Sequence, residues 1–368
     1  MPKSKLKKVI LVCGARPNFM KVVPLWDQMK KRPGKFLPVI LHTGQHYHVN
    51  MSDLFFKDLG LPKPDICLDV GSASHAVQTA KIMIRFEQIL AKERPDLIIV
   101  VGDVNSTLAC AVVASKLSVP IAHVESGLRS FDKTMPEEIN RIVTDHLSDF
   151  LFTTCKDADD NLRNEGIAKK KVFFVGNVMI DTLIKLTAKI ARSNILDRLG
   201  LARQDYAVLT LHRPSNVDEK KALGKILGAL KMISKRIPIV FPAHPRTVKQ
   251  LKNTGLNINY RNITILKPLG YRDFLKLCMN SKFVLTDSGG IQEETTYLNI
   301  PCLTLRENTE RPNTVKEGTN ILVGSDKDKI ISESLKILSA RHKTGIAPEL
   351  WDGRAAERIV KILEDKIT

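Results

Sequence analysis

Residues 97–102 read LIIVVG, and the polar stretch DVNST follows at 103–107. An apolar run of this kind, closed by a glycine, is typical of a strand buried on both faces of a parallel sheet. Residues 106–116 then have the length and the apolar face of a helix. This order of apolar strand, polar loop and amphipathic helix predicts a parallel sheet with crossover helices.

The same alternation extends in both directions from this stretch. In the first half, strands are expected at residues 8–13, 36–42, 121–124 and 150–153, and helices at 17–31, 75–92 and 136–147. In the second half, the strand pattern resumes at residues 171–175, 206–211, 237–241, 263–266, 283–286 and 302–305. We therefore predict an α/β fold of two Rossmann-like, doubly wound domains that face a cleft, joined near Gly176. The predicted parts are residues 1–175, residues 176–350 and a C-terminal helical segment at 351–368.

Composition favours a globular protein. The chain has 368 residues, of which 43% are hydrophobic and 26% charged, and no apolar run approaches the roughly 20 residues that cross a bilayer. The basic start runs directly into the first expected strand, so we expect no cleaved leader and a cytoplasmic location. The six cysteines form no C-x-x-C pair, which favours reduced thiols over disulfides or a zinc site.

The charge balance indicates an anionic partner. Lys+Arg number 57 and Asp+Glu 39, and 57 − 39 gives a net charge of +18. Aromatic residues make up only 5% of the chain, and no basic stretch alternates with stacking rings, so we expect no nucleic-acid partner. A phosphorylated small molecule fits this charge, although a basic surface alone would also account for it.

A glycine-containing loop follows the expected strand at 283–286. It reads DSGGIQEE over residues 287–294. Gly289 and Gly290 would let the backbone after Ser288 approach a phosphate at a helix N-terminus, and Glu294 could accept both hydroxyls of a ribose. The alternative is a strand-to-helix turn that needs glycines for its geometry alone.

Basic residues follow strands in both halves. Gly14-Ala15-Arg16-Pro17-Asn18 has one glycine where a dinucleotide fingerprint needs three, so a bound NAD is not expected. Arg16 and Lys21 instead suit phosphate oxygens, as does Arg311 in the second half, although arginines in loops are often merely solvated.

Acidic residues follow strands in the first half only. They are Asp103, Glu125 and the first residue of the Glu137-Glu138 pair. Asp103 could serve as a helix N-cap, and Glu137 could simply favour a helix N-terminus, whereas Glu125 has no such structural role in sight. Carboxylates at strand ends are candidates for proton transfer.

The histidines show no zinc spacing such as H-E-x-x-H. His42, His46 and His48 are interpreted as part of a polar loop. His212 ends an expected strand and precedes Arg213, a position that suits contact with an anion.

Together, these motifs resemble those of the non-hydrolysing UDP-N-acetylglucosamine 2-epimerases. The matching motifs, in order, are GARPN, HTGQH, GDVNST, HVESGLR, PEEINR, VGNVMID, HRPSN, DSGGIQEE and TERP. The resemblance implies the glycosyltransferase-B fold, a UDP-sugar substrate, no metal or nicotinamide cofactor and a homodimer. It further implies interconversion of UDP-N-acetylglucosamine and UDP-N-acetylmannosamine through loss and re-addition of UDP.

The resemblance also implies roles for individual residues. It implies that the N-terminal domain carries the catalytic carboxylates, that the C-terminal domain binds UDP, and that the last helix crosses back to the first domain. Asp103, Glu125 and Glu137 match the catalytic carboxylates, and His212 would assist departure of the diphosphate. The matching nucleotide contacts are Arg16, Lys21, Phe274 near the uracil, Ser288, Gly289, Gly290, Glu294 and Arg311.

The chain departs from the common pattern at a few positions. Asn18 and Ser215 stand where acids are usual, so sugar recognition is expected to shift while activity survives. Gln45 and His244 match residues that bind an activating second substrate in some bacterial members, but Val77 and His48 replace two others of that set. A 2-epimerase of a UDP-2,3-diacetamido sugar and a UDP-sugar glycosyltransferase of the same fold are the alternatives.

Overall fold

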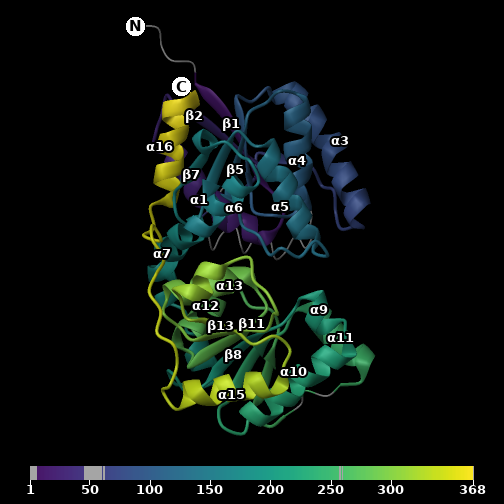
Figure 1. The fold of residues 1–368 in the computed structure, drawn as a ribbon, viewed down its shortest axis with the longest axis vertical. Coiled ribbons are helices and arrows are strands. Elements are labelled where there is room, and N and C mark those ends of the chain that lie inside the picture. The colour runs from purple at the N-terminus through teal and green to yellow at the C-terminus, as the bar shows by residue number, and fades with distance from the viewer. Residues whose placement is uncertain (1–5, 45–59, 61–62, 257, 259, 368) are drawn as a thin grey trace. The chain divides into compact units, whose positions relative to one another are not determined.

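The computed structural model describes residues 6–44, 60, 63–256, 258 and 260–367. The chain forms two compact units (Figure 1), one made of Met1–Lys185 with Glu349–Thr368 and the other of Leu186–Pro348. Each unit contains one parallel sheet with intervening helices, which confirms the predicted α/β fold with two Rossmann-like domains. The expected joint near Gly176 and the observed division after Lys185 lie on either side of the start of α7 (Val178–Ala191).

The sheet of unit 1 has the strand order β3-β2-β1-β4-β5-β6-β7. Its strands are β1 (Lys7–Cys13), β2 (Phe36–His42), β3 (Ile66–Cys67), β4 (Leu97–Val101), β5 (Ile121–Ser126), β6 (Phe150–Thr153) and β7 (Val172–Phe174). β1 and β4 are neighbours although two strands separate them in sequence. The chain therefore reverses direction across the sheet between β1 and β4, which is where α/β folds bind ligands.

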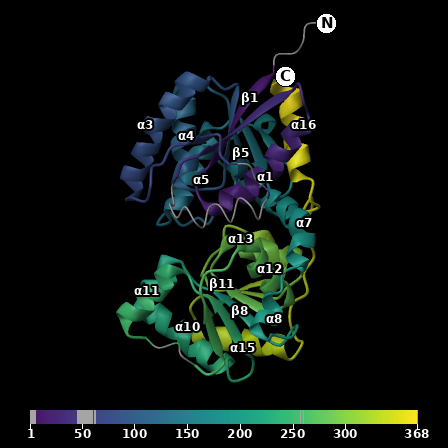
Figure 2. The same ribbon diagram turned by 180° about the vertical axis from the view of Figure 1, so that it is seen from behind.

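Helices cover this sheet and bury apolar faces against it. They are α1 (Arg16–Lys30), α3 (His75–Glu93), α4 (Asn105–Lys116), α5 (Pro136–Leu147), α6 (Lys156–Asn164) and α16 (Ala355–Ile367), with a short 3-10 turn at Lys169–Lys171. The C-terminal helix α16 lies beside α1 in Figure 1 and Figure 2. Asp181 on α7 accepts hydrogen bonds from the backbone N–H groups of Ala355 and Ala356, so α7 caps the N-terminus of α16.

The sheet of unit 2 has the order β10-β9-β8-β11-β12-β13. Its strands are β8 (Ala207–Thr210), β9 (Ile239–Pro242), β10 (Ile263–Leu266), β11 (Phe283–Thr286), β12 (Cys302–Thr304) and β13 (Asn320–Leu322). Its helices are α8 (Ile195–Leu199), α9 (Pro214–Val217), α10 (Lys220–Ile233), α11 (Pro245–Thr254), α12 (Tyr271–Asn280), α13 (Gly289–Tyr297), α14 (Pro312–Lys316) and α15 (Lys327–Leu338). Here the reversal falls between β8 and β11.

Two further observations concern the cysteines and the helices. All six cysteines are free thiols, and five of them are buried while Cys67 is exposed. None of the helices in the described part of the chain combines the length and apolar character needed to span a bilayer.

Candidate active site

The candidate residues gather at the carboxyl end of each sheet, around the point where the strand order reverses. In unit 1 they follow β1 or β4, lie in β5, or open α5. In unit 2 they follow β8, β11 or β12, or lie on α12 and α13. Each unit therefore carries its own set of candidate residues, at a place that the sheet topology creates.

Glu125 is held in an unusual backbone conformation. It lies in β5 where the pairing with β6 shifts register between Val124 and Ser126, and its φ is +70°. A non-glycine residue in this region is strained, and such strain is concentrated at functional sites. The Glu125 carboxylate is buried, with only 2% of the side chain exposed, and accepts a hydrogen bond from the Lys21 Nζ. Lys21 and Glu125, far apart in sequence, thus form a buried ion pair.

Gly102 makes room for this pair. Its φ is +66°, and a Cβ atom there would lie 2.8 Å from the Lys21 Nζ and 3.4 Å from the Glu125 Oε2. The backbone that leads from β4 to Asp103 therefore runs directly beside the ion pair. The structure brings Lys21, Glu125 and the start of the Asp103 loop together, as expected of groups at neighbouring strand ends.

Asn18 ties the first loop to the end of β4. Its Oδ1 accepts hydrogen bonds from the N–H groups of Gly14 (3.0 Å) and Ala15 (2.8 Å), and its Nδ2 donates to the carbonyl of Val101 (3.1 Å). The last of these bonds needs an N–H donor, which an acid at this position would lack when ionised. The asparagine thus fixes the loop that carries Arg16.

Asp103 is held by α5. Its carboxylate accepts a hydrogen bond from the Arg141 Nη1, and its carbonyl accepts one from the Asn140 Nδ2 at 2.9 Å. Arg141 also donates to the buried Glu138, with 2.6 Å between Nη2 and Oε2. Sequence reasoning did not single out Arg141, although Glu138 and Arg141 have the i, i+3 spacing of a helical ion pair.

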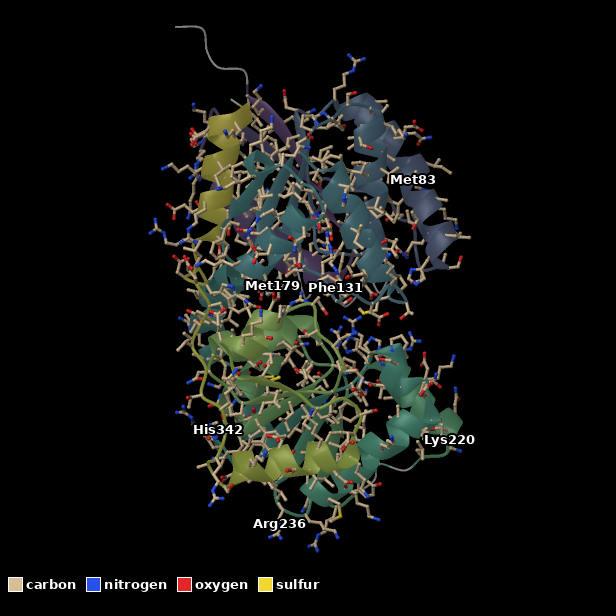
Figure 3. All side chains as sticks on the ribbon, viewed as in Figure 1. Met83, Phe131, Met179, Lys220, Arg236 and His342 are labelled. Atoms are coloured by element: carbon tan, nitrogen blue, oxygen red, sulfur yellow. The ribbon has the colours of Figure 1, made fainter. Side chains whose placement is uncertain are left out.

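The two neighbouring acids of α5 have different surroundings. The Glu138 carboxylate accepts hydrogen bonds from the backbone N–H groups of Ser130 (3.0 Å) and Phe131 (2.7 Å). Burial alone would raise the pKa of Glu138, but these bonds and Arg141 lower it below its usual value. Glu138 therefore organises the loop that ends at Phe131, a residue that is 79% exposed (Figure 3). Glu137 is half-buried and remains the candidate for proton transfer.

A buried network lies beneath the candidate residues of unit 1. The His123 Nδ1 is 2.7 Å from the Asp145 Oδ1, and the His123 Nε2 is 2.9 Å from the Gly102 carbonyl oxygen. The other Asp145 oxygen accepts from the Gly127 N–H at 3.1 Å and pairs with Arg129 at 2.7 Å. Burial would raise the pKa of Asp145, but His123 and Arg129 lower it. The network joins the loops on either side of Glu125 into one unit.

In unit 2, the glycine-containing loop opens α13. Ser288 and Gly290 are half-buried, and the Ser288 N–H donates to the Thr286 Oγ1 at 3.0 Å. A Cβ atom at Gly289 would lie 2.5 Å from the Arg311 Nη1 and 2.7 Å from the Glu310 Oε1. The glycine therefore permits the close approach of Arg311 to the helix N-terminus, where an anion is favoured.

Arg311 belongs to a buried cluster of charges. Its Nε lies 2.9 Å from the Glu293 Oε1, and its Nη1 donates to Glu310. Arg306 pairs with the other Glu310 oxygen at 2.8 Å. Burial lowers the pKa of Arg306 and Arg213 adds to that effect, whereas Glu310 opposes it. Several cations thus meet near the loop that was expected to bind phosphate.

Glu294 lies one turn into α13 and is buried. Its Oε1 accepts a hydrogen bond from the Tyr271 hydroxyl at 2.8 Å. Burial raises the pKa of Glu294 to about 8, and the neighbouring Glu293 adds to the rise while the Tyr271 bond opposes it. Phe274, one turn after Tyr271 on α12, is half-buried and packs against an apolar cluster flanked by Ile291.

His212 follows β8 and is oriented by a carboxylate. Its Nδ1 lies 2.7 Å from the Oδ1 of Asp287, which is fully buried, while 39% of the His212 side chain is exposed. The ring of His244 lies 6.1 Å from that of His212, centroid to centroid. The sequence indicated His212 but gave Asp287 no separate role.

A few residues named in the sequence analysis lie outside the described residues or away from the candidate site. The Arg16 backbone opens α1, but its side chain is outside the described residues, as are Gln45, His46 and His48. Val77 is exposed on α3. The described residues contain no group of three or more His, Cys, Asp or Glu side chains placed to hold a metal ion.

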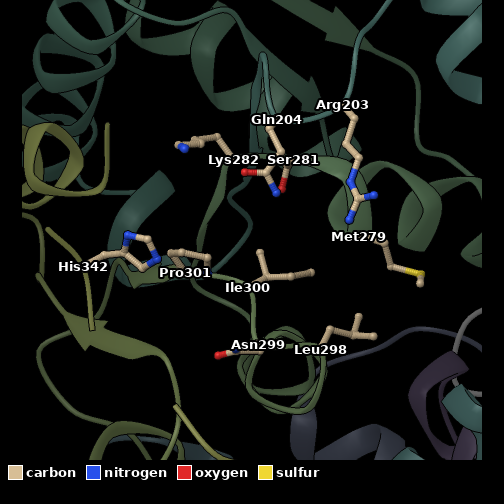
Figure 4. A pocket seen from close by; sticks show the side chains of 10 residues that line it. All are labelled: Arg203, Gln204, Met279, Ser281, Lys282, Leu298, Asn299, Ile300, Pro301 and His342. Carbon is tan, nitrogen blue, oxygen red and sulfur yellow. The ribbon is translucent and has the colours of Figure 1, made fainter. Parts of the chain in front are cut away.

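A cavity of about 260 Å³ in unit 2 lies elsewhere (Figure 4). Its lining includes Gln204, Lys282 and Pro301, which precede β8, β11 and β12. It therefore opens at the amino ends of these strands, whereas the candidate residues follow their carboxyl ends. We assign the candidate site to the carboxyl ends because the acids, cations and oriented histidine lie there.

Comparisons with known proteins agree on one family. A family model described as UDP-N-acetylglucosamine 2-epimerase matches residues 27–364. The chain is 44% identical to the UDP-N-acetylglucosamine 2-epimerase of Methanocaldococcus jannaschii, over 97% of this chain and 98% of that protein. It is 41% identical to the UDP-2,3-diacetamido-2,3-dideoxy-D-glucuronate 2-epimerase of Pseudomonas aeruginosa, over 97% of this chain and 99% of that protein. The crystal structure of the M. jannaschii UDP-GlcNAc 2-epimerase in complex with UDP-GlcNAc and UDP matches with a TM-score of 0.90 and 43% identity, over 97% of this chain and 99% of that chain.

Proposed function

The chain belongs to the UDP-N-acetylglucosamine 2-epimerase family, and from that membership we propose that it interconverts UDP-GlcNAc and UDP-ManNAc without hydrolysing them. The product would serve as a precursor of cell-surface polysaccharides. The observation that carries the proposal is the strained, buried Glu125 beside Lys21 and the Asp103 loop. Backbone strain of this kind is concentrated at functional sites.

The chemistry explains why both acids and cations are needed. The hydrogen at C2 has no adjacent carbonyl to acidify it, so its direct removal faces a high barrier. Breaking the C1–O bond sends the electron pair to the diphosphate, and removal of the C2 proton then gives 2-acetamidoglucal. Re-addition of UDP, with protonation on the other face, inverts C2. These reaction steps involve no net oxidation or reduction and therefore require no nicotinamide.

We assign the two demands of this reaction to the candidate residues of the two units. Asp103, Glu125 and Glu137 would move the proton at C2, as acid–base groups on different elements. Arg311, Ser288, Gly289 and Gly290 would hold the diphosphate through N–H groups, charge and the α13 N-terminus. Arg16 and Lys21 would contribute further phosphate contacts, while Glu294 would accept from the ribose hydroxyls and Phe274 would lie by the uracil.

An isotope experiment tests the proposal. Purified protein incubated with UDP-GlcNAc in deuterated water is expected to form UDP-ManNAc and to place deuterium at C2 of both sugars, as read by mass spectrometry and NMR. An unlabelled sugar pool would rule out this chemistry. Transfer of the sugar to an acceptor, without label at C2, would instead support a glycosyltransferase.

The identity of the relatives leaves a second substrate to consider. The P. aeruginosa relative is named for a UDP-2,3-diacetamido-2,3-dideoxy-D-glucuronate, and it matches this chain almost as closely as the M. jannaschii epimerase does. Running the same isotope experiment with both UDP-sugars in competition would rank them by the ratio of their kcat/KM values.

We further propose a cytoplasmic homodimer that binds no nucleic acid. Apolar side chains are exposed on α3 and on α5 of unit 1, where a second copy could cover them. They are Val77, Ile84, Ile139 and Val143. Light scattering of the purified protein would test the dimer, and a salt-dependent titration with random duplex DNA would test for nucleic-acid binding.

Gly289→Ala is expected to weaken UDP binding by about 10- to 100-fold, the usual scale for losing a hydrogen bond to a charged group. The added methyl group would collide with the Arg311 guanidinium and displace it from the α13 N-terminus. Calorimetric titration with UDP measures the effect. Gly224→Ala on α10 is the matched control, because a Cβ atom there meets nothing within 4 Å. Equal UDP affinity in the two variants would contradict the role of Gly289.

A further inference from the structure

Asp287 makes more contacts than a turn between a strand and a helix requires. It directly follows β11 and is fully buried. Its Oδ2 accepts hydrogen bonds from the backbone N–H groups of His212 at 2.9 Å and Arg213 at 2.8 Å. It also accepts from the Asn216 Nδ2 at 3.3 Å, and its Oδ1 lies 2.7 Å from the His212 Nδ1. Asp287 thus holds both the backbone and the ring of His212.

The surroundings keep Asp287 ionised. Burial alone would raise its pKa, but the hydrogen bond and charge of His212, together with the backbone N–H groups, lower it below the usual value. The charged and titratable groups around His212 are Asp287 on the β11 loop, Arg213 next to it in the chain, and His244 at the start of α11. Of these three groups, Asp287 is the one that can accept the Nδ1 proton of His212 as a carboxylate.

We propose that Asp287 is a positioning residue that fixes the orientation and tautomer of His212, so that its Nε2 meets the departing diphosphate. With the Nδ1 proton donated to the Asp287 Oδ1, Nε2 is the ring nitrogen left to face a ligand, and the ring is partly exposed. This inference rests on the proposed function for the identity of the ligand. It assigns to Asp287 a role that neither the motif nor the comparisons state.

The role follows from the charge that develops when the C1–O bond breaks. The bonding electron pair moves to the β-phosphate oxygen of UDP, and a proton at the His212 Nε2 can be donated to that oxygen. When UDP adds back, the proton returns to Nε2 and the C1–O bond re-forms. A ring free to turn, or protonated at the wrong nitrogen, would fail at both stages.

Asp287→Asn tests this role by its kinetics. An amide keeps the size of the side chain but no longer demands a proton on Nδ1, so kcat is expected to fall by about 10²- to 10⁴-fold. His212→Asn should cause a loss of similar size, and the double variant should lose little more, because Asp287 acts through His212. Asp218→Asn on the surface of unit 2 is the matched control and should leave kcat unchanged.

The ¹⁵N spectrum of His212 separates this role from a purely structural one. At a pH at which the His212 ring is neutral, the wild-type imidazole should carry its proton on Nδ1, whereas Asp287→Asn should show a mixture of tautomers. A variant that keeps the wild-type tautomer would overturn the proposal, whether or not it loses activity, and so would losses that multiply in the double variant. If the wild type lacked epimerase activity, the proposed function would fail, but the spectrum would still decide the Asp287–His212 pairing.

Discussion

Glu125→Gln is expected to lower the rate of C2 epimerisation by about 10²- to 10⁴-fold, the range seen when an acid–base group is lost. The amide occupies the same volume but cannot take up the C2 proton. UDP affinity should stay close to the wild-type value, because Lys21 keeps its charge and the loop proposed to bind the diphosphate lies in unit 2. Deuterium incorporation at C2 measures the rate, and calorimetry measures the affinity.

The same substitution also leaves Lys21 without its carboxylate. Breaking one side of a buried ion pair costs about 3–5 kcal/mol, so a fall in thermal stability is expected as well. Turnover must therefore be measured well below the unfolding midpoint of the variant. Glu93→Gln provides the matched control, since Glu93 pairs with Lys8 near the opposite end of the sheet at 3.1 Å. If Glu125→Gln turned over as fast as Glu93→Gln, Glu125 could not be an acid–base group.

The fold could be predicted because it depends on local patterns. β1, β4 and β11 are apolar runs bounded by polar loops, and the structure places them where the alternation predicted. β3 and β13, of two and three residues, were not predicted. Such strands exist only because a neighbouring strand pairs with them.

The candidate site could be predicted only in part, for a related reason. Asp103 and His212 could be named as candidates because each follows a strand, which is a local feature. Their partners Arg141 and Asp287 lie 38 and 75 residues away, and no pattern along the chain links them. The choice between Glu137 and Glu138 rested on resemblance. The structure adds a physical reason, since the hydrogen bonds of Glu138 are committed to the loop at Ser130 and to Arg141.

The conformation of Glu125 could not have been predicted from its residue type. A positive φ is the property of glycine and, less often, of asparagine or aspartate. At Glu125 the surrounding contacts impose it, through the ion pair with Lys21 and the network of His123 and Asp145 beneath the loop. These contacts are long-range, so they become visible only once the chain is folded.

Glu294→Gln is expected to stabilise the protein in the absence of ligand, increasingly so as the pH rises. In the folded protein the pKa of Glu294 is about 8, against an ordinary value of 4.5. Between these two values the folded state keeps a proton that the unfolded state has lost, so the wild type loses stability as the pH rises through this window. One pKa unit corresponds to about 1.36 kcal/mol, so at pH 7 the wild type has lost about 3 kcal/mol of its free energy of unfolding. Glutamine does not titrate, so the variant does not lose this stability.

The same residue should couple UDP binding to proton release. Ribose hydroxyls are donors here, and the best acceptor for them is the ionised carboxylate. UDP binding at pH 7 should therefore release a proton from Glu294, and the affinity should rise as the pH approaches 8. Glu294→Gln should lose about 10- to 100-fold in affinity, because a bond to a charged acceptor is replaced by a weaker one.

Three measurements separate these effects from a general change in unit 2. Thermal unfolding of the wild type and of Glu294→Gln at pH 5, 7 and 9 should show midpoints that diverge with pH. Glu333→Gln on α15, which loses only a surface pair with Lys336 at 2.7 Å, should follow the wild type throughout. Calorimetry of UDP binding in two buffers of different ionisation enthalpy should give different heats for the wild type and more nearly equal heats for Glu294→Gln.

Tyr271→Phe is expected to raise the pKa of Glu294 further. Removing the hydroxyl takes away the donor that favours the Glu294 carboxylate, so the loss of stability should extend to higher pH than in the wild type. UDP affinity at pH 7 should fall, because a larger share of Glu294 holds its proton. Parallel stability curves for the wild type, Glu294→Gln and Tyr271→Phe would mean that Glu294 does not carry this proton, and its assignment to the ribose would then have to rest on position alone.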